Sequence, residues 1–487
     1  MARILNLIKV SLKSPAIFYL ISRYGTYIIQ FINSLLIAAF LGPYYLGIWG
    51  FIYLVIGYVG QVNLGIPHSL NVILSIKKKN KELSTHILQN GVTMTLILSI
   101  LTILFFVSIK LNLIQVGVKY QFSNYAWTVA LIAILTHFNS VLSNVFRVYG
   151  KITAIAINQS LYPLFVLIIV FLFRGENLLW AILFANCLAF IVSFIIYIFQ
   201  TPVNLTPLFN SKIVRIIQIK GWYLFLYNAS FYLILLSTKS FISSHYSIVE
   251  FGYFTFAYSL ANVVSLLLNS VSFLIYPKML NRFATTDGKQ TISILTDIRT
   301  AYISTSHLLI HLLIVLFPLF LYFFPNYSDA STSFKITALT VVLYTNSFGY
   351  QGLLLAKGRE KKVASIALGA LIVNVLLAML LIYILAVSFD YVILATLLTY
   401  LLYVYLLGFW GRKVLKLSTK VEEVLKDIFP IKQSIPFVLS LCLLFFGASN
   451  VYFVLPFLVY LFLNYKDIIV IKNTIKKIIS NPNFINI

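Results

Sequence analysis

Long apolar runs recur along this whole 487-residue chain, and they constrain its fold more than any other feature. A helix of ~20 apolar residues crosses the ~30 Å hydrocarbon layer of a bilayer. Runs of that kind lie near 16–40, 46–74, 84–109, 125–149, 152–173, 177–200, 217–241, 251–277, 300–324, 334–356, 363–387 and 391–410, and two shorter ones near 434–447 and 451–464. The pattern predicts an all-α polytopic membrane protein with about 14 transmembrane helices, the last two forming a C-terminal pair. Because that pair is short, a re-entrant hairpin is the alternative to two crossings.

Composition supports a membrane protein and argues against a soluble or nucleic-acid-binding protein. Only 10% of the residues are charged, against roughly 25% in soluble proteins. The net charge of +24 comes from residues between the apolar runs, so it indicates loop anchors rather than a nucleic-acid surface. Cys187 and Cys442 both lie inside apolar runs without metal-ligand spacing, and no cofactor is expected. The N-terminal stretch has no signal-peptide cleavage pattern.

The basic residues set the orientation. With the N-terminus in the cytoplasm, 30 of the 36 lysines and arginines fall in inward segments, among them the run Lys77, Lys78, Lys79 and Lys81. Five fall outside, namely Lys110, Lys119, Arg174, Lys239 and Lys335, and Arg23 lies within the first span. Cytoplasmic loops are enriched in exactly these residue types, so both termini are predicted to be cytoplasmic.

The sequence lacks the motifs that mark several classes of enzyme. The chain has no Gly-x-x-x-x-Gly-Lys-Ser/Thr loop, no His-Glu-x-x-His pair and no Gly-x-Ser-x-Gly elbow. All 12 acidic residues lie in loops or at span ends, and the longest outward connection, about 110–124, is too short for a catalytic domain. The sequence therefore predicts a protein that is not an enzyme.

Arg23 is the first candidate site residue, because it lies seven residues, or ~10 Å, inside the first span. A charge at that depth costs at least ~2.5 kcal/mol unless it faces water or a partner. Two explanations are open: the side chain snorkels to the headgroups, or it lines a cationic cavity that holds an anion. His68 at similar depth, Arg147 at the inner end of the fourth span and Lys239 near the outer end of the seventh are the other candidates for such a cavity. Packing or interface anchoring is the alternative for each.

The second span is unusually rich in helix-disturbing residues. Gly57, Gly60, Gly65 and Pro67 fall within 11 residues of one another. In membrane helices these residues permit close packing and bending. Their density favours a flexible helix that lines a cavity, with ordinary packing as the alternative.

A weak internal repeat divides the chain. Gly47 and Gly252 begin similar aromatic stretches 205 residues and six spans apart, which predicts two halves of the same orientation. The expected domains are an N-terminal lobe at 1–210, a C-terminal lobe at 211–415, and a linker, the final pair and an amphipathic cytoplasmic tail at 416–487.

Two stretches resemble a known family. FLGPYYLGIWGFIYLVIGYVGQVNLGIP and FGYFTFAYSLANVVSLLLNSVSFLIYPKM are similar to the paired patterns of bacterial polysaccharide flippases, the O-antigen and capsule exporters of the multidrug/oligosaccharidyl-lipid/polysaccharide (MOP) superfamily. The resemblance implies two six-helix lobes that form a V around a cationic cavity in the inner membrane and work by alternating access. It implies undecaprenyl-pyrophosphate-linked oligosaccharide as cargo, with a polysaccharide polymerase and a chain-length regulator as partners. Peptidoglycan-precursor flippases of this superfamily carry first-span arginines, the type that Arg23 matches, but their other cavity arginines have no clear match here.

Two other functions compete with this hypothesis. A cation-coupled multidrug exporter of the same fold would need an intramembrane acid, and the first span has none. A membrane polysaccharide polymerase or ligase would be expected to carry a large outward loop with charged residues.

Overall fold

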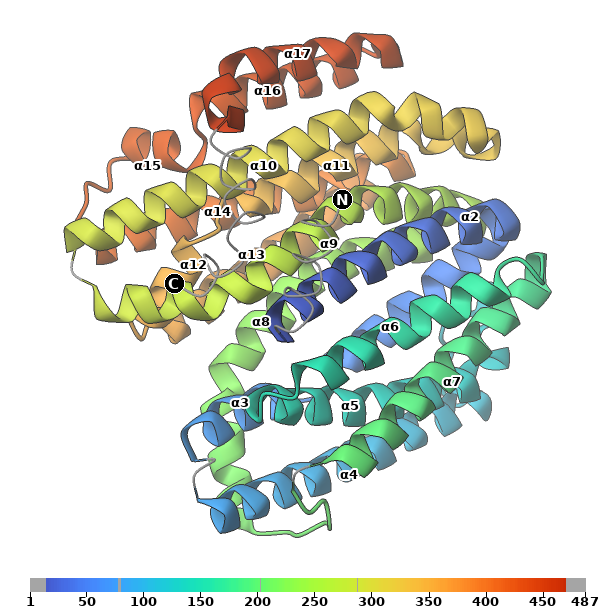
Figure 1. The fold of residues 1–487 in the computed structure, drawn as a ribbon. Helices are drawn as coiled ribbons and strands as arrows, with labels where there is room; N and C mark the ends of the chain where they lie inside the picture. The colour runs from blue at the N-terminus through green and yellow to red at the C-terminus, as the bar shows by residue number, and fades with distance from the viewer. Residues whose placement is uncertain (1–14, 78–79, 202, 287, 470–487) are drawn as a thin grey trace, which may run out of the picture. The chain divides into compact units, whose positions relative to one another are not determined.

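The computed structural model describes residues 15–77, 80–201, 203–286 and 288–469. Predictions that fall on the first 14 residues, on Lys78 and Lys79, and on the tail from residue 470 onward lie outside this range. The described chain consists of helices and turns and contains no strand, which confirms the all-α prediction (Figure 1). It forms two compact units, which we call the N-terminal unit (1–252) and the C-terminal unit (253–487).

The N-terminal unit contains α2 (Pro15–Gln61), α3 (Ile66–Lys77), α4 (Lys81–Lys110), α5 (Ala126–Val148), α6 (Ile152–Ile169), α7 (Gly175–Gln200) and α8 (Ser211–His245), with short turns at Val118–Tyr120 and Phe122–Asn124. Helix α9 (Ile248–Thr285) begins in this unit and continues into the next. The C-terminal unit adds α10 (Gly288–Phe323), α11 (Ser331–Thr345), α12 (Tyr350–Ala356), α13 (Glu360–Met379), α14 (Leu394–Val414), α15 (Val421–Ile428), α16 (Ile431–Phe445) and α17 (Val454–Leu463). Short turns lie at Pro325–Ala330, Leu380–Ile384, Phe389–Tyr391 and Asn450–Phe453.

The helices confirm a multi-pass membrane protein. Among the described residues, nine helices are long and apolar enough to cross a bilayer, or up to 11 if each of two bent pairs is one span. This number is below 14 because α2 counts once although it covers two predicted runs, and because α8 passes only as a pair bent by 43°, Ser211–Ile219 and Gly221–His245. In addition, α11, α16 and α17 are each shorter than 18 residues. The predicted run 334–356 is divided between α11 and α12.

Helix α2 is two helices joined at a kink. Gly42 has φ 71° and ψ 170°, a left-handed conformation that side chains disfavour, and Pro43 follows it. The gap between the predicted runs 16–40 and 46–74 therefore lies at this kink. The predicted run 46–74 is in turn broken between α2 and α3, at residues 62–65.

One side chain, that of Asn63, binds backbone groups on both sides of the break between α2 and α3. Asn63 donates its amide to the Gly60 carbonyl (2.8 Å) and accepts from the Gly65 N–H (2.9 Å). Gly65 has φ +73°, and Pro67 lies in the first turn of α3, where its missing N–H has no helical partner to lose. Because these polar backbone groups are satisfied locally, the helix can break at membrane depth.

Helix α8 packs within the N-terminal unit. Asn210 caps its first turn by accepting from the N–H groups of Lys212 and Ile213, and its own N–H donates to Asn90 of α4 (2.6 Å). The core beside it includes Leu70 of α3, Leu88 of α4 and Val145 of α5, all buried. This packing puts α8 with the first half of the chain, whereas the sequence placed it in the second lobe; the lobe boundary at 210 remains a prediction.

The start of α9 is fixed by a reciprocal cap. The Ser247 N–H and hydroxyl both donate to the Glu250 carboxylate (2.8 and 2.6 Å), and the Glu250 N–H donates to Ser247 Oγ (3.2 Å). This is a capping box, which defines where the helix begins. Glu250, an acid of the predicted outward side, thus has a structural role.

Two glycines let α9 approach α2 closely. A Cβ on Gly47 would lie 2.1 Å from the Ile248 carbonyl oxygen, and a Cβ on Gly252 would lie 1.9 Å from the Pro43 carbonyl oxygen. Ile248 follows Pro43 by 205 residues, as Gly252 follows Gly47, so the two contacts are equivalent under the internal repeat. Small residues at a helix crossing permit this backbone-to-backbone packing.

The longest predicted outward connection covers the end of α8. Tyr120 donates its hydroxyl to the Ser243 carbonyl (2.8 Å), and Lys119 donates to the Ser244 carbonyl (3.2 Å). A cation at a helix C-terminus is favourable because the terminal carbonyls carry partial negative charge. Burial lowers the pKa of Lys119, an effect that Glu250 partly offsets.

Candidate functional site

Three of the four predicted cavity residues are connected in the N-terminal unit. Arg23 lies in the first half of α2, His68 in the first turns of α3 after the break, and Arg147 in the last turn of α5. Tyr19 interacts electrostatically with both Arg23 and Arg147, and His68 interacts with Arg147. We call Arg23, His68 and Arg147 the cationic cluster.

Aromatic rings hold Arg23 in place. Its guanidinium lies 4.5 Å from the centroid of the Tyr27 ring and 6.0 Å from that of Tyr19, and it donates a hydrogen bond to the Tyr27 hydroxyl. Both tyrosines are buried, whereas Arg23 is half-buried. Within the described ranges, no carboxylate forms an ion pair with Arg23. Its charge is therefore stabilised by ring faces and not cancelled by an acid.

The other members of the cluster are accessible. His68 is exposed although its neighbours Pro67 and Ser69 are buried, and Arg147 is half-buried. Tyr19 and Tyr27 were not among the predicted site residues. The spacing of Tyr19, Arg23 and Tyr27 was the available signal, because residues four apart lie on one face of a helix.

Lys239 lies elsewhere in the same unit. It is on α8 beside Ser240, whose hydroxyl lies 2.7 Å from that of Tyr58 in the second half of α2. It therefore belongs to the packing between α2 and α8, and its contact with an anion stays a prediction.

The predicted flexible residues flank the same helix pair. A Cβ on Gly57 would lie 3.2 Å from Leu236 of α8, and one on Gly65 would lie 2.8 Å from the Cβ of Phe225. Gly60, by contrast, has open space around it. Gly57 and Gly65 serve close packing on α8, while the flexibility proposed for all four residues remains untested.

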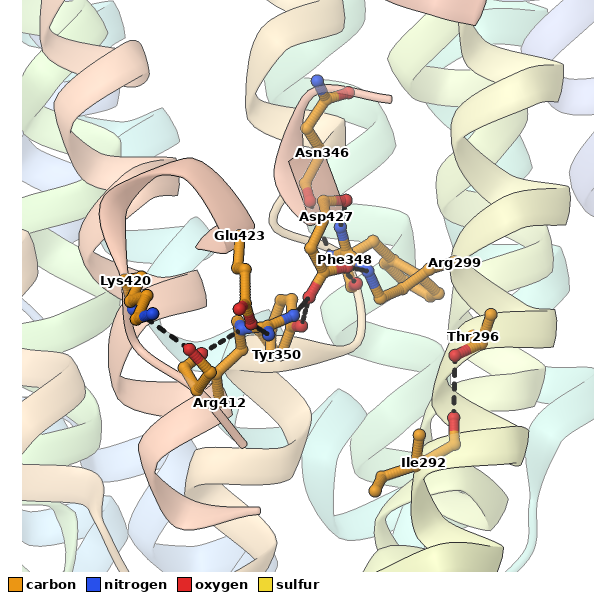
Figure 2. A network of polar contacts seen from close by, with 11 residues as sticks. Ile292, Thr296, Arg299, Asn346, Phe348, Tyr350, Arg412, Lys420, Glu423 and Asp427 are labelled. Carbon is orange, nitrogen blue, oxygen red and sulfur yellow. Dashed lines mark hydrogen bonds and ion pairs between the residues drawn. The ribbon is translucent and has the colours of Figure 1, made fainter. Parts of the chain in front are cut away.

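A second polar network, in the C-terminal unit, was not predicted. It joins α10, α12, α14 and α15 through Arg299, Tyr350, Arg412, Glu423 and Asp427, and we call it the α15 network (Figure 2). In the sequence, Arg299 and Arg412 fall in inward segments, where basic residues are expected to be loop anchors. Arg299 is instead 4% exposed.

Arg299 is a backbone cap as well as an ion-pair partner. It donates to the carbonyls of Asn346 (2.7 Å) and Phe348 (3.0 Å), at the break between α11 and α12, and to the Asp427 carbonyl at the end of α15 (3.1 Å). These carbonyls lie at helix ends, where intrahelical donors are missing. Its side chain also pairs with the Asp427 carboxylate at 3.9 Å.

Asp427 also links this network to α12 and α14. Its carboxylate accepts from Arg412 (3.1 Å) and from the Tyr350 hydroxyl, while Arg412 also pairs with Glu423 at 3.0 Å. Buried Val424 and Ile428 lie on the same helix, and Ile428 fills the space that Gly408 leaves on α14. Helix α15, which lies in the predicted linker, is thus held by both ion pairs and apolar packing.

We expect Asp427→Asn to destabilise this unit by about 1–3 kcal/mol, because two partly buried arginines would lose their carboxylate. Thermal melting of the purified protein in detergent would measure the effect. Glu422→Gln is the matched control and should leave the melting temperature unchanged, because among the described residues Glu422 pairs only with Lys426, at 2.6 Å on the exposed surface. Equal melting temperatures for the two variants would contradict the anchoring role of Asp427.

Comparison with known proteins relates this chain to a protein family. A family model described as "Polysaccharide biosynthesis protein" matches residues 12–281. No curated protein sequence matches the chain.

Solved structures of low sequence identity share the fold. An inward-facing multidrug resistance MATE family transporter of the MOP superfamily aligns with TM-score 0.69 at 13% identity, over 82% of this chain and 98% of the other. Its outward-facing counterpart aligns with TM-score 0.60 at 14% identity, over 84% and 95%. A MOP superfamily transporter from Pyrococcus furiosus aligns with TM-score 0.55 at 13% identity, over 84% of this chain and 95% of the other; it is described as having a binding pocket of reverse polarity that suggests a different function. The chain therefore belongs to the polysaccharide biosynthesis protein family, and its fold is that of MATE family transporters of the MOP superfamily.

Proposed function

We propose that this protein is a flippase that moves undecaprenyl-pyrophosphate-linked oligosaccharide repeat units across the bacterial inner membrane by alternating access. The single observation that carries the proposal is the cationic cluster within a member of a polysaccharide biosynthesis family. The termini would face the cytoplasm, and the product would enter O-antigen, capsule or exopolysaccharide synthesis. A polysaccharide polymerase and a chain-length regulator are the partners that such a pathway requires.

The chemistry of the cluster suits a pyrophosphate. An isolated anion entering a low-dielectric region loses several kcal/mol of hydration, so a carrier must supply opposite charge and donors. An arginine has five N–H donors, and a planar guanidinium can bind phosphate oxygens in pairs. Arg23 donates one hydrogen bond to Tyr27 and forms no ion pair with a carboxylate among the described residues, so its other N–H donors are available to a ligand.

Reconstitution tests the proposal directly. Proteoliposomes carrying the protein and a lipid-linked oligosaccharide in the inner leaflet should expose the glycan to an external lectin or glycosidase, whereas protein-free liposomes should not. No gain in exposure over protein-free liposomes would refute the flippase function.

A cation-coupled multidrug exporter is the second candidate, favoured by the multidrug MATE transporters among the solved structures of this fold. For the P. furiosus transporter of this fold, the reversed polarity of the binding pocket is described as suggesting a different function. Pocket charge can therefore distinguish functions within one fold. The cationic cluster repels cationic drugs. Cells expressing the protein should therefore gain no resistance to cationic dyes, and a gain would favour the exporter.

A further inference from the structure

Two histidines lie in the interior of the C-terminal unit, within a predicted membrane span. His307 and His311 are on α10, seven and eleven residues, or ~10 and ~16 Å, inside the apolar run that begins at residue 300. Each is 2% exposed. An ionisable side chain at that depth marks a candidate functional site, because a charge there is costly without a partner or water. The function proposed for the cationic cluster uses neither ring.

Both histidines lie where the C-terminal pair, α16 and α17, packs against α10 (Figure 1). Ser304, His307 and His311 share one face of α10, because they are three and four residues apart. Gln433 of α16 donates to Ser304 Oγ (3.0 Å), and Tyr460 of α17 donates to the Ser304 carbonyl (2.5 Å). We call these five buried residues the histidine seam.

Hydrogen bonds decide which nitrogen of each neutral ring carries the proton. His307 Nε2 lies 3.3 Å from Oδ1 of Asn346, an oxygen that can only accept, so Nε2 is the protonated nitrogen. The Ser440 hydroxyl donates to the Pro436 carbonyl (2.9 Å), so its oxygen offers only lone pairs to the ring. His311 Nδ1 lies 3.5 Å from that oxygen and is therefore the protonated nitrogen of His311.

Each ring is left with one basic nitrogen. Nδ1 of His307 and Nε2 of His311 are buried and have no hydrogen-bond partner within the described ranges. These are the two atoms that accept a proton when a neutral imidazole becomes an imidazolium. The seam thus holds two proton acceptors that its packing does not satisfy.

No acid is paired with these rings. None of the ion pairs within the described ranges includes either histidine. The Tyr460 ring of α17 lies 5.6 Å from that of His311 between centroids, and its hydroxyl already donates to Ser304. Asp297, the acid on the helices of the seam, lies ten residues, or ~15 Å, before His307 on α10. The charged residues on α10, α11, α16 and α17 are Lys289, Asp297, Arg299, Lys335 and Lys432.

We infer that His307 and His311 form a proton-binding site that controls how tightly the C-terminal pair packs against α10. In the closed seam both rings are neutral, because an imidazolium there would be buried without an acid. The pair takes up one proton and not two, because two imidazolium rings with centroids 6.2 Å apart repel each other. This inference goes beyond the proposed function and does not depend on it.

The proton binds when the seam opens to water. A cavity of about 420 Å³ lies beside the seam and is lined by Thr300, Ile303 and Gln433, among others. By the orientation predicted from the basic residues, this cavity is on the cytoplasmic side. Water that enters from it can hydrate the imidazolium, so a proton binds the open seam more tightly than the closed one. A ligand shifts the population toward the state that it prefers, so a fall in cytoplasmic pH opens the seam.

Hydrogen–deuterium exchange of the purified full-length protein in detergent tests the inference. After correction for the intrinsic pH dependence of exchange, the amides of α16 and α17 should exchange about ten-fold faster for each pH unit below about 6.5, because each opening takes up one proton. The amides of α13, outside the seam, should show no such dependence. This comparison uses the unmodified protein and therefore needs no variant.

A double variant removes the proton site and keeps both ring hydrogen bonds. The amide introduced by His307→Gln can replace the Nε2 donor, and the amide introduced by His311→Asn can replace the Nδ1 donor. The double variant should exchange like the unmodified protein at pH 8 and lose the pH dependence in α16 and α17. His86→Gln, at a half-buried histidine of α4, is the matched control and should keep the dependence.

Two outcomes would overturn the inference. If α16 and α17 of the unmodified protein showed no pH dependence beyond the intrinsic one, the seam would not open with proton uptake. If the double variant kept the full dependence, another group would bind the proton. Neither measurement uses a lipid-linked cargo, so failure here is distinguishable from failure of the flippase function.

Discussion

Replacing Arg23 with alanine is expected to abolish surface polysaccharide while leaving the protein in the membrane. Among the described residues, ring contacts hold the Arg23 guanidinium without a paired acid, so its loss would remove the charge that we propose binds the pyrophosphate. Losing one or two charge-assisted hydrogen bonds should slow transport about ten- to hundred-fold. Polysaccharide on intact cells and protein in the membrane fraction would be measured together.

Arg174→Ala is the matched control for Arg23→Ala. Arg174 also stacks on a ring, 3.6 Å from the Phe40 centroid, but it donates to the carbonyls at the end of α6, outside the cluster. It should lower stability without abolishing transport. Arg23→Lys keeps the charge and loses the paired donors, so we expect partial activity. Normal polysaccharide in Arg23→Ala would rule out the anion-binding role.

Alanine at Gly47 or Gly252 is expected to be the most damaging of the glycine substitutions in the described chain. Each new methyl group would meet a backbone carbonyl oxygen at about 2 Å, and a carbonyl within a helix cannot turn aside as a flexible side chain can. Helix α9 would have to move away from α2, at a cost of about 1–3 kcal/mol. The melting temperature should fall, and transport should fall with it.

Gly369→Ala provides the control for this prediction. Gly369 is also within a helix, but a Cβ there has nothing within 4 Å, so alanine should be neutral or stabilise by about 0.5–1 kcal/mol. If Gly47→Ala or Gly252→Ala melted at the same temperature as Gly369→Ala, the close contact between α2 and α9 would be disproved. Because the internal repeat relates the two contacts, we expect effects of similar size at both glycines.

The two units stabilise their arginines by different kinds of contact. In the C-terminal unit, Arg299 and Arg412 pair with acids from α15. In the N-terminal unit, Arg23 and Arg174 contact ring faces, and Arg174 also binds carbonyl oxygens. A ring face or a carbonyl stabilises a cation without cancelling its charge, so these arginines keep their attraction for an anion.

The sequence by itself determined the class of this protein and most of its helices. Apolar runs of membrane length leave few alternatives, because only a helix satisfies its own backbone in lipid without a closed barrel. Position along those runs also indicated Arg23, His68 and Arg147 as candidate site residues, since a charge in or beside an apolar run is costly without a partner or water, and their role stays a prediction. The glycines before Pro67 indicated bending in the second span, and the structure has the break between α2 and α3 there.

Only the tertiary structure decided which of these residues meet. Spacing along one helix can relate Arg23 to Tyr19 and Tyr27, but the link from Tyr19 to Arg147 joins α2 to α5, more than 100 residues later. The α15 network likewise joins residues from four helices, so Arg299 and Arg412 looked like ordinary loop anchors in the sequence. Hydropathy describes how each helix meets lipid, whereas polar contacts between helices depend on packing, which a linear pattern does not contain.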